Sequence, residues 1–126
     1  IVVAIDGKRV KNKMMVVVKG GRLVTTKELV SWSIKVQKLG AGEILLTSMD
    51  TDGVQNGFDS EMLKKVTRNV SLPVIASGGV GSLNHFYLGY KTKSTGLLAA
   101  SVFHSGKYSV LKVKKYLKKK GVPVRL

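Results

Sequence analysis

The chain has 126 residues, 44% of them hydrophobic, and a formal net charge of +15 from 22 Lys and Arg against 7 Asp and Glu. This composition suits one domain with its own core and excludes a disordered chain, and the lack of Cys excludes disulfides and thiolate chemistry. The apolar runs are far shorter than the roughly 18 residues that a membrane span needs, so we expect no membrane contact and a cytoplasmic location.

The hydrophobic pattern alternates between strand-like and helical segments. In chain order it predicts a strand at 1–6, a hairpin strand at 14–18 that pairs with 9–11, a helix that follows Thr25 and runs to about 39, a strand at 43–47, a helix at 60–70, a strand at 74–76, a helix at 82–90, a strand at 96–100 and a helix from 108 or 109 to 120. Thr25 and Glu28 have the spacing of a capping box, which places the first helix start at Thr25. Alternating strands and helices imply right-handed crossovers and a parallel sheet. The predicted fold is therefore α/β with four parallel strands, either half of a (β/α)8 barrel or a small open sheet.

The last predicted helix holds the densest basic run, KVKKYLKKK at 112–120. Arg is the commoner residue for reading bases and for bidentate phosphate contacts, but most of the basic residues here are Lys. No aromatic RNA-binding motif accompanies the run. We therefore interpret the charge as lysine-rich helix surfaces and expect no nucleic-acid partner, although a positive field also attracts phosphorylated small molecules.

The chain opens on the apolar run IVVAID, without an initiator Met. A natural start rarely lies inside a core strand. We therefore interpret residues 1–126 as a single domain that is a fragment, or a processed or designed piece, of something longer.

A polar or glycine-rich cluster follows each predicted parallel strand. These clusters are Asp6, the segment TSMDTDG at 47–53, the segment SGG at 77–79, and Ser101. Because (β/α) barrels place their chemistry at the carboxyl ends of the strands, we expect the four clusters to form one site.

Two kinds of carboxylate stand in these clusters. Asp6 could act as a general acid or base, although Asp-Gly is also an ordinary turn pair. Asp50 and Asp52 could together bind a metal, but the loop lacks the EF-hand spacing, and a loop rich in Asp, Gly and Asn is also simply a loop. We expect no metal site and no cofactor.

The segment SGGVG at 77–81 lies between a strand and a helix, where successive glycine N–H groups can cradle an anion. Ala99 to Ser101 follows the next strand, and the last two such loops of a barrel commonly bind phosphate together. Plain tight turns are the alternative. His85 and His104 have no neighbouring Cys or His, so structural or surface roles are expected for both.

Several motifs closely resemble the cyclase subunit of imidazole glycerol phosphate synthase. They are VVAIDGKRV at 2–10, KGGR at 19–22, GAGEILLTSMDTDGVQNGFD at 40–59, LPVIASGGVG at 72–81, AASVFH at 99–104 and the ending YLKKKGVPVRL. The resemblance extends over essentially the whole chain but matches only the C-terminal half of that family's barrel. The sister isomerase of histidine biosynthesis shares the barrel and the SGG loop, but its second-strand motif looks different and it ranks second.

The resemblance implies a (β/α)8 barrel with one phosphate site in each half and an ammonia supply from a glutaminase partner. It implies that ammonia and phosphoribulosyl-formimino aminoimidazole carboxamide ribotide give imidazole glycerol phosphate and aminoimidazole carboxamide ribotide. Two aspartates, one in each half, serve as acid and base in that family. Asp6 matches the one in the C-terminal half.

The resemblance also implies a set of binding residues. Those that match the family's substrate and phosphate positions, or line the same site, are Thr47, Asp52, Gly53, Ser77, Gly78, Gly79, Ala100 and Ser101. Glu43 matches a carboxylate of the charged ring at the barrel bottom, where ammonia enters, and Arg125 falls near that face. Val54 departs from the Thr usual in the family, and KTKSTGLL at 91–98 replaces a small-residue lead, which puts the local helix–strand packing in doubt.

Two functions follow as the main alternatives, and a third, a basic nucleic-acid-binding protein, predicts binding to DNA or RNA that depends steeply on salt. In the first, the chain is a lyase-type cyclase that works only when the missing N-terminal half, or a second copy, completes the barrel. In the second, it is a catalytically silent phosphate-binding half-barrel. Alone, the fragment has an unclosed sheet with two long exposed edges, so we expect it to self-associate or aggregate.

Overall fold

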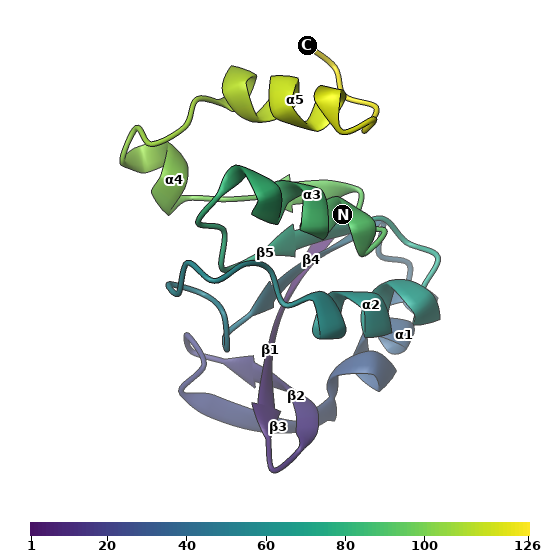
Figure 1. Cartoon of the computed structure of the whole chain (residues 1–126). Coiled ribbons are helices and arrows are strands. Elements are labelled where there is room, and N and C mark those ends of the chain that lie inside the picture. The colour runs from purple at the N-terminus through teal and green to yellow at the C-terminus, as the bar shows by residue number, and fades with distance from the viewer.

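The structure is a computed structural model that describes residues 1–126, and it shows an α/β fold built on one six-stranded sheet (Figure 1). The strands are β1 (Val2–Val10), β2 (Lys13–Val18), β3 (Leu23–Glu28), β4 (Glu43–Ser48), β5 (Val74–Ser77) and β6 (Gly96–Leu98). The helices are α1 (Leu29–Lys38), α2 (Ser60–Asn69), α3 (Leu83–Lys91), α4 (Ser101–His104) and α5 (Val110–Lys119). None of these helices combines the length and the apolar character that crossing a bilayer requires.

The strand order in the sheet is β3-β2-β1-β4-β5-β6. Strands β1, β4, β5 and β6 are parallel neighbours, which confirms the four predicted parallel strands of a half-barrel. Strands β2 and β3 add an antiparallel extension beside β1. Helices lie in the crossovers between the parallel strands, as parallel pairing requires.

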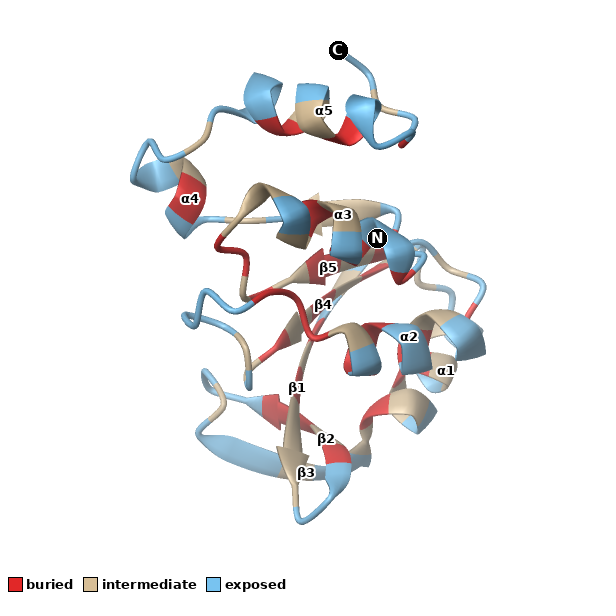
Figure 2. Ribbon diagram, viewed as in Figure 1, coloured by how far each residue is buried: buried red, intermediate tan, exposed pale blue.

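The main hydrophobic core lies between the sheet and its helices. Along β4 the side chains of Ile44, Leu46 and Ser48 are buried, whereas the residues between them are only partly buried. This period of two matches a strand with one covered face. Figure 2 shows buried positions in red on the strands and on the helices, and a cluster of 20 buried hydrophobic residues forms this core.

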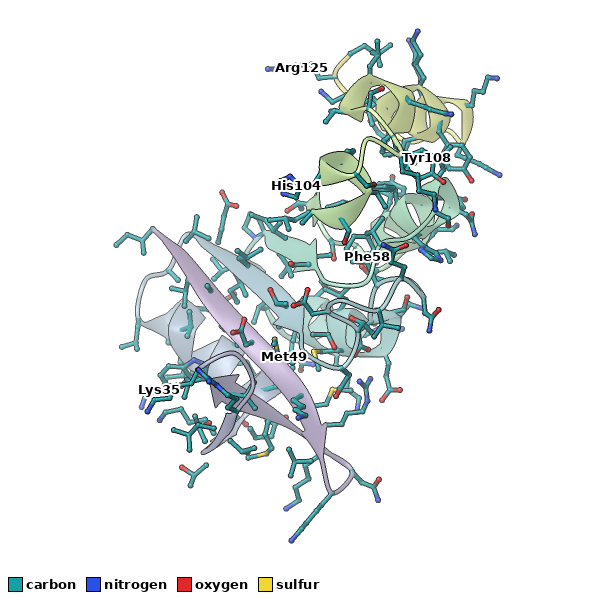
Figure 3. The ribbon with its side chains drawn as sticks, turned by 90° about the vertical axis from the view of Figure 1, so that its left-hand side faces the viewer. Lys35, Met49, Phe58, His104, Tyr108 and Arg125 are labelled. Atoms are coloured by element: carbon teal, nitrogen blue, oxygen red, sulfur yellow. The ribbon has the colours of Figure 1, made fainter.

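The other face of the parallel strands is open. Figure 3 looks toward it, with β1 crossing in front and no helix over the strand. Ala4, Leu45, Ile75 and Gly96 pair in sequence across the four strands and form one apolar row on this face. Such rows are the layers that fill the interior of a closed (β/α)8 barrel, so this face has the character of a barrel interior.

The first helix starts later than predicted. Thr25 lies in β3, where its hydroxyl donates to the Val16 carbonyl at 2.7 Å, so the predicted capping box is wrong. Glu28 caps the helix instead, with its carboxylate accepting from the N–H groups of Val30 and Ser31. Pairing of residues 23–28 with β2 outweighs the local capping signal because it satisfies several backbone groups at once.

Two strand ends also differ from the prediction. Strand β1 continues to Val10 because its last residues pair with β2. This is the pairing that was predicted between residues 9–11 and the hairpin strand. Strand β6 stops at Leu98, two residues early, because Ala100 serves as N-cap of the unpredicted helix α4. The last helix begins after Ser109, as predicted, and the Ser109 hydroxyl accepts from the Lys112 N–H at 3.1 Å.

The unusual segment at 91–98 packs without an unpaired buried polar group. Thr92 and Ser94 are buried, and their hydroxyls are 2.8 Å apart. The Thr92 hydroxyl also donates to the Gly89 carbonyl at 2.6 Å, and Thr67 donates to the Thr92 carbonyl at 2.8 Å. The doubt about packing in this segment is therefore removed, because hydrogen bonds satisfy the polar side chains that replace small residues.

Candidate functional site

The carboxyl ends of the parallel strands bring three of the predicted residues into one row. Asp6 pairs with Thr47, and Thr47 pairs with Ser77, in consecutive registers of β1, β4 and β5. All three are partly buried positions that alternate with the core side chains of their strands. They therefore lie side by side on the open face, one layer above the apolar row.

A small cleft adjoins this row. It is lined by Asp52, Gly53, Val54, Gln55, Ser77, Gly78, Gly79, Val80, Leu98, Ala99, Ala100 and Ser101. Every predicted binding residue except Thr47 belongs to this lining. Its volume of about 50 Å³ is far below the roughly 300 Å³ or more of a pocket that encloses a drug-sized ligand. The cleft is therefore suited to one small polyatomic group, not to a whole substrate.

Four backbone amides at the cleft lack acceptors. The N–H groups of Gly53, Gly78, Gly79 and Ala100 donate to no backbone or side-chain group of the chain. Gly78 is buried and Gly79 partly buried, where an N–H without an acceptor costs free energy, whereas Gly53 and Ala100 are exposed and their N–H groups are open to water. These residues come from three loops that line one cleft, where their N–H groups can together hold an oxyanion.

Glycine is required where two of these loops meet. Gly78 and Gly79 have φ of +100° and +111°, and a Cβ added to Gly79 would overlap the Gly57 carbonyl oxygen. The Gly57 N–H donates to the Gly79 carbonyl at 2.7 Å, and the Thr51 hydroxyl donates to the Gly78 carbonyl at 2.9 Å. The loop after β4 and the loop after β5 are thus held in direct contact.

The charged groups in and around the cleft act in opposite directions on an anion. Asp52 is the only charged side chain in its lining. All 7 carboxylate side chains of the chain lie within the first 61 residues, so the loops after β5 and β6 belong to a stretch with only cationic charged side chains. That background favours an anion in the cleft. Burial, and secondarily the charge of Asp52, raise the pKa of Asp6.

The sequence did not predict the ion-pair network that lies behind the cleft. Arg9 donates to both carboxylate oxygens of Asp59, from Nη1 at 2.6 Å and from Nη2 at 2.8 Å. Asp59 also accepts from the Ser48 hydroxyl at 2.7 Å and from the Met62 N–H at 3.1 Å, which caps α2. An Asp directly before a helical run is a standard N-cap signal, so the cap could have been predicted, but its partner across 50 residues could not.

Burial by itself would raise the pKa of Asp59, but the hydrogen bonds from Arg9, Ser48 and the Met62 N–H outweigh it and hold that pKa below its usual range. The ionised carboxylate therefore stabilises the fold above the ordinary pKa of Asp, and this contribution is lost as the pH falls through the lowered value.

We expect Asp59→Asn to lower the free energy of unfolding by about 2 kcal/mol at pH 7, because a neutral amide cannot form all the hydrogen bonds that the ionised carboxylate accepts. Urea unfolding at pH 7 and pH 3 should show the difference from wild type shrinking at the lower pH. Glu61→Gln is the control, because Glu61 is exposed and 3.8 Å from Arg9. A difference for Asp59→Asn that does not change with pH would contradict the expectation.

The other predicted residues lie apart from the cleft. Glu43 opens β4 at the opposite end of the sheet, beside Val2, and Arg125 lies in the tail after α5, labelled in Figure 3. No salt bridge joins Glu43 or Arg125 to another residue of the chain. Their role at an entry face stays a prediction.

Three further expectations concern side chains that looked structural or metal-binding. His85 accepts at Nδ1 from the N–H groups of Gly81 and Ser82, which is the structural role expected for it. Asp50 pairs with Arg9 at 2.9 Å. No group of three or more His, Asp or Glu side chains gathers in the chain to hold a metal ion.

Comparison with known proteins gives a consistent family. Residues 1–109 match the family model described as "Histidine biosynthesis protein". Among curated proteins, the chain is 51% identical over its full length to the imidazole glycerol phosphate synthase subunit HisF of Chlorobium limicola, of which it covers 51%. It is 52% identical to the same subunit of Thermococcus onnurineus and 50% identical to that of Dehalococcoides mccartyi, again over its full length and half of theirs. The chain therefore spans about half the length of the curated relatives it matches.

Proposed function

This chain belongs to the histidine biosynthesis protein family, and we propose that it supplies the C-terminal half of the cyclase barrel of imidazole glycerol phosphate synthase. The completed barrel would combine ammonia with phosphoribulosyl-formimino aminoimidazole carboxamide ribotide. The products would be imidazole glycerol phosphate and aminoimidazole carboxamide ribotide. A lyase-type reaction of this pathway would run in the cytoplasm.

One observation carries the assignment of a phosphate site. The unpaired N–H groups of Gly53, Gly78, Gly79 and Ala100 belong to residues that line one cleft of about 50 Å³, the size for one small anion. Amide donors fixed before binding stabilise a phosphate group without the cost of reorganising the loops. The cleft would hold one phosphate of the substrate, and the rest of the substrate would extend over the open face toward Asp6.

Asp6 is the proposed acid or base of this half. It stands in the same row as Thr47 and Ser77, and its raised pKa suits a carboxyl group that must carry a proton in part of a catalytic cycle. Thr47, its direct neighbour on β4, would face the substrate.

The barrel interior needs a second half. The apolar row of Ala4, Leu45, Ile75 and Gly96 lies on a face with no helix, and β6 is an edge strand with no neighbour on its outer side. Four parallel strands with these features would be covered by the N-terminal half of the same barrel, or by a second copy. A glutaminase would deliver ammonia at the end of the sheet that carries Glu43 and Arg125.

The test is cyclase turnover with ammonium chloride and the ribulosyl substrate, first with the chain alone and then with a separately produced N-terminal half-barrel. We expect turnover only in the mixture. Turnover by the chain alone would identify a homodimer that builds its site from two copies of Asp6.

A mixture that folds and associates but does not turn over would contradict the cyclase proposal. An amide NMR titration with inorganic phosphate then decides whether the alternative, a silent phosphate-binding half-barrel, holds. Saturable shifts at Gly53, Gly78, Gly79 and Ala100 would support that alternative, and their absence would contradict it as well.

A further inference from the structure

The loop that carries Asp52 and Gly53 is fastened at both ends by a single side chain. This loop, residues 49–59, leaves β4 at Met49, labelled in Figure 3, and ends at Asp59 before α2. Near its start, Asp50 Oδ2 accepts from the Arg9 backbone N–H at 3.0 Å and from Arg9 Nη1 at 2.9 Å. At its end, Asp59 accepts from both terminal nitrogens of the same guanidinium.

Arg9 makes this connection from the strand that carries Asp6. The two residues lie three positions apart on β1, so their side chains leave opposite faces of the sheet. Asp6 faces the open side, beside Thr47, whereas Arg9 pairs in register with the buried Met14 on the helix-covered side. The guanidinium therefore reaches the loop from behind the site, without contacting the cleft.

The geometry requires a guanidinium, not merely a positive charge. Asp59 has a side chain only 6% exposed, and the contact between it and Arg9 uses two parallel N–H donors. A Lys ammonium is a single point donor and cannot match a carboxylate in this way while also reaching Asp50. Arg9 thus contacts both ends of the loop from the strand of Asp6, and Ser48, at the end of β4, also contacts both ends through its hydroxyl and carbonyl groups.

The remaining contacts of the loop transmit its position to the cleft. Thr51 donates to the Gly78 carbonyl, and the Asp52 N–H donates to the Ser48 carbonyl at 3.0 Å. A shift of the loop relative to β1 would therefore move both Gly53 and the glycine loop after β5.

We propose that Arg9 is a positioning residue that sets the placement of the phosphate cradle relative to Asp6. The Arg9 guanidinium joins the strand of Asp6 to the loop of Asp52 and Gly53, so it fixes the distance between the two ends of the substrate site. This inference rests on the proposed function, because it assumes that the cleft binds phosphate.

The test is an amide NMR titration of the chain with inorganic phosphate, comparing wild type, Arg9→Lys and Arg22→Lys. Arg22 is a matched control, because its Nε donates only to the Lys19 carbonyl in the exposed turn between β2 and β3. We expect Arg9→Lys to weaken phosphate binding at Gly53 and Gly79 by about tenfold or more, and Arg22→Lys to leave it unchanged.

Asp50→Asn is the second variant, and it keeps the test decisive if Arg9→Lys does not fold. It leaves the buried pair between Arg9 and Asp59 intact and weakens only the attachment at the start of the loop. We expect a several-fold loss of phosphate affinity with little change in the urea midpoint, a separation that a purely structural role would not produce.

Three outcomes are distinguishable. Weakened phosphate binding in folded Arg9→Lys or Asp50→Asn supports the inference. Wild-type phosphate affinity in both Asp50→Asn and any folded Arg9→Lys overturns it and leaves the proposed function standing. Absence of a phosphate response in the wild-type chain overturns the phosphate site and this inference together.

Discussion

Replacing Asp6 with Asn is expected to lower turnover of the completed barrel by about 10²- to 10⁴-fold, the range for a group that transfers a proton in the transition state. Asn keeps the shape of the side chain and its place in the row with Thr47 and Ser77. It cannot accept or release a proton at this position. The loss should therefore appear in kcat, with KM for the ribulosyl substrate changed little.

The measurement is steady-state turnover with ammonium in the mixture of both half-barrels. Glu28→Gln is a suitable control because it makes the same chemical change at the start of α1. Phosphate titration of Asp6→Asn should still show shifts at Gly79, since Asp6 is not in the lining of the cleft. Turnover within about threefold of wild type would show that Asp6 is not the acid or base of this half.

The pattern of strands and helices was predictable because it depends on local periodicity. Strands at 43–47 and 74–76 each lie within one residue of β4 and β5, since a buried parallel strand is a short, nearly continuous apolar run. The placement of Asp6, Thr47 and Ser77 in one row then follows from parallel register. The strand pattern alone was therefore enough to group most residues of the candidate site.

What sequence reasoning missed depends on pairing between distant residues. Residues 23–28 form β3 because β2 offers backbone partners, and the β-branched residues Val24, Thr25 and Thr26 suit a strand, a local signal that competes with the capping-box spacing. The contact between Arg9 and Asp59 joins residues 50 positions apart. Asp50 was considered as a metal ligand because its neighbour Asp52 is acidic, whereas its actual partner is a cation from another strand.

Gly79→Ala is expected to lower the free energy of unfolding by about 4 kcal/mol, combining the cost of a strained backbone with that of overpacking. Its φ of +111° lies in a region that side chains other than glycine rarely adopt. The added methyl group would also overlap the Gly57 carbonyl oxygen, which belongs to backbone and cannot rotate away. Relief of that overlap must separate the loop after β5 from the loop after β4.

Gly106→Ala separates the two costs. Gly106 has a φ of +76° but nothing within 4 Å of an added Cβ, so it carries backbone strain alone and should lose about 1 kcal/mol. Urea unfolding of both variants gives the comparison, and phosphate titration gives the functional consequence. Because the Gly79 N–H is one of the free donors of the cradle, the Gly79 variant should lose phosphate binding, whereas the Gly106 variant should keep it. Equal stability losses with phosphate binding retained in both would mean that the contact between the two loops does not shape the cradle.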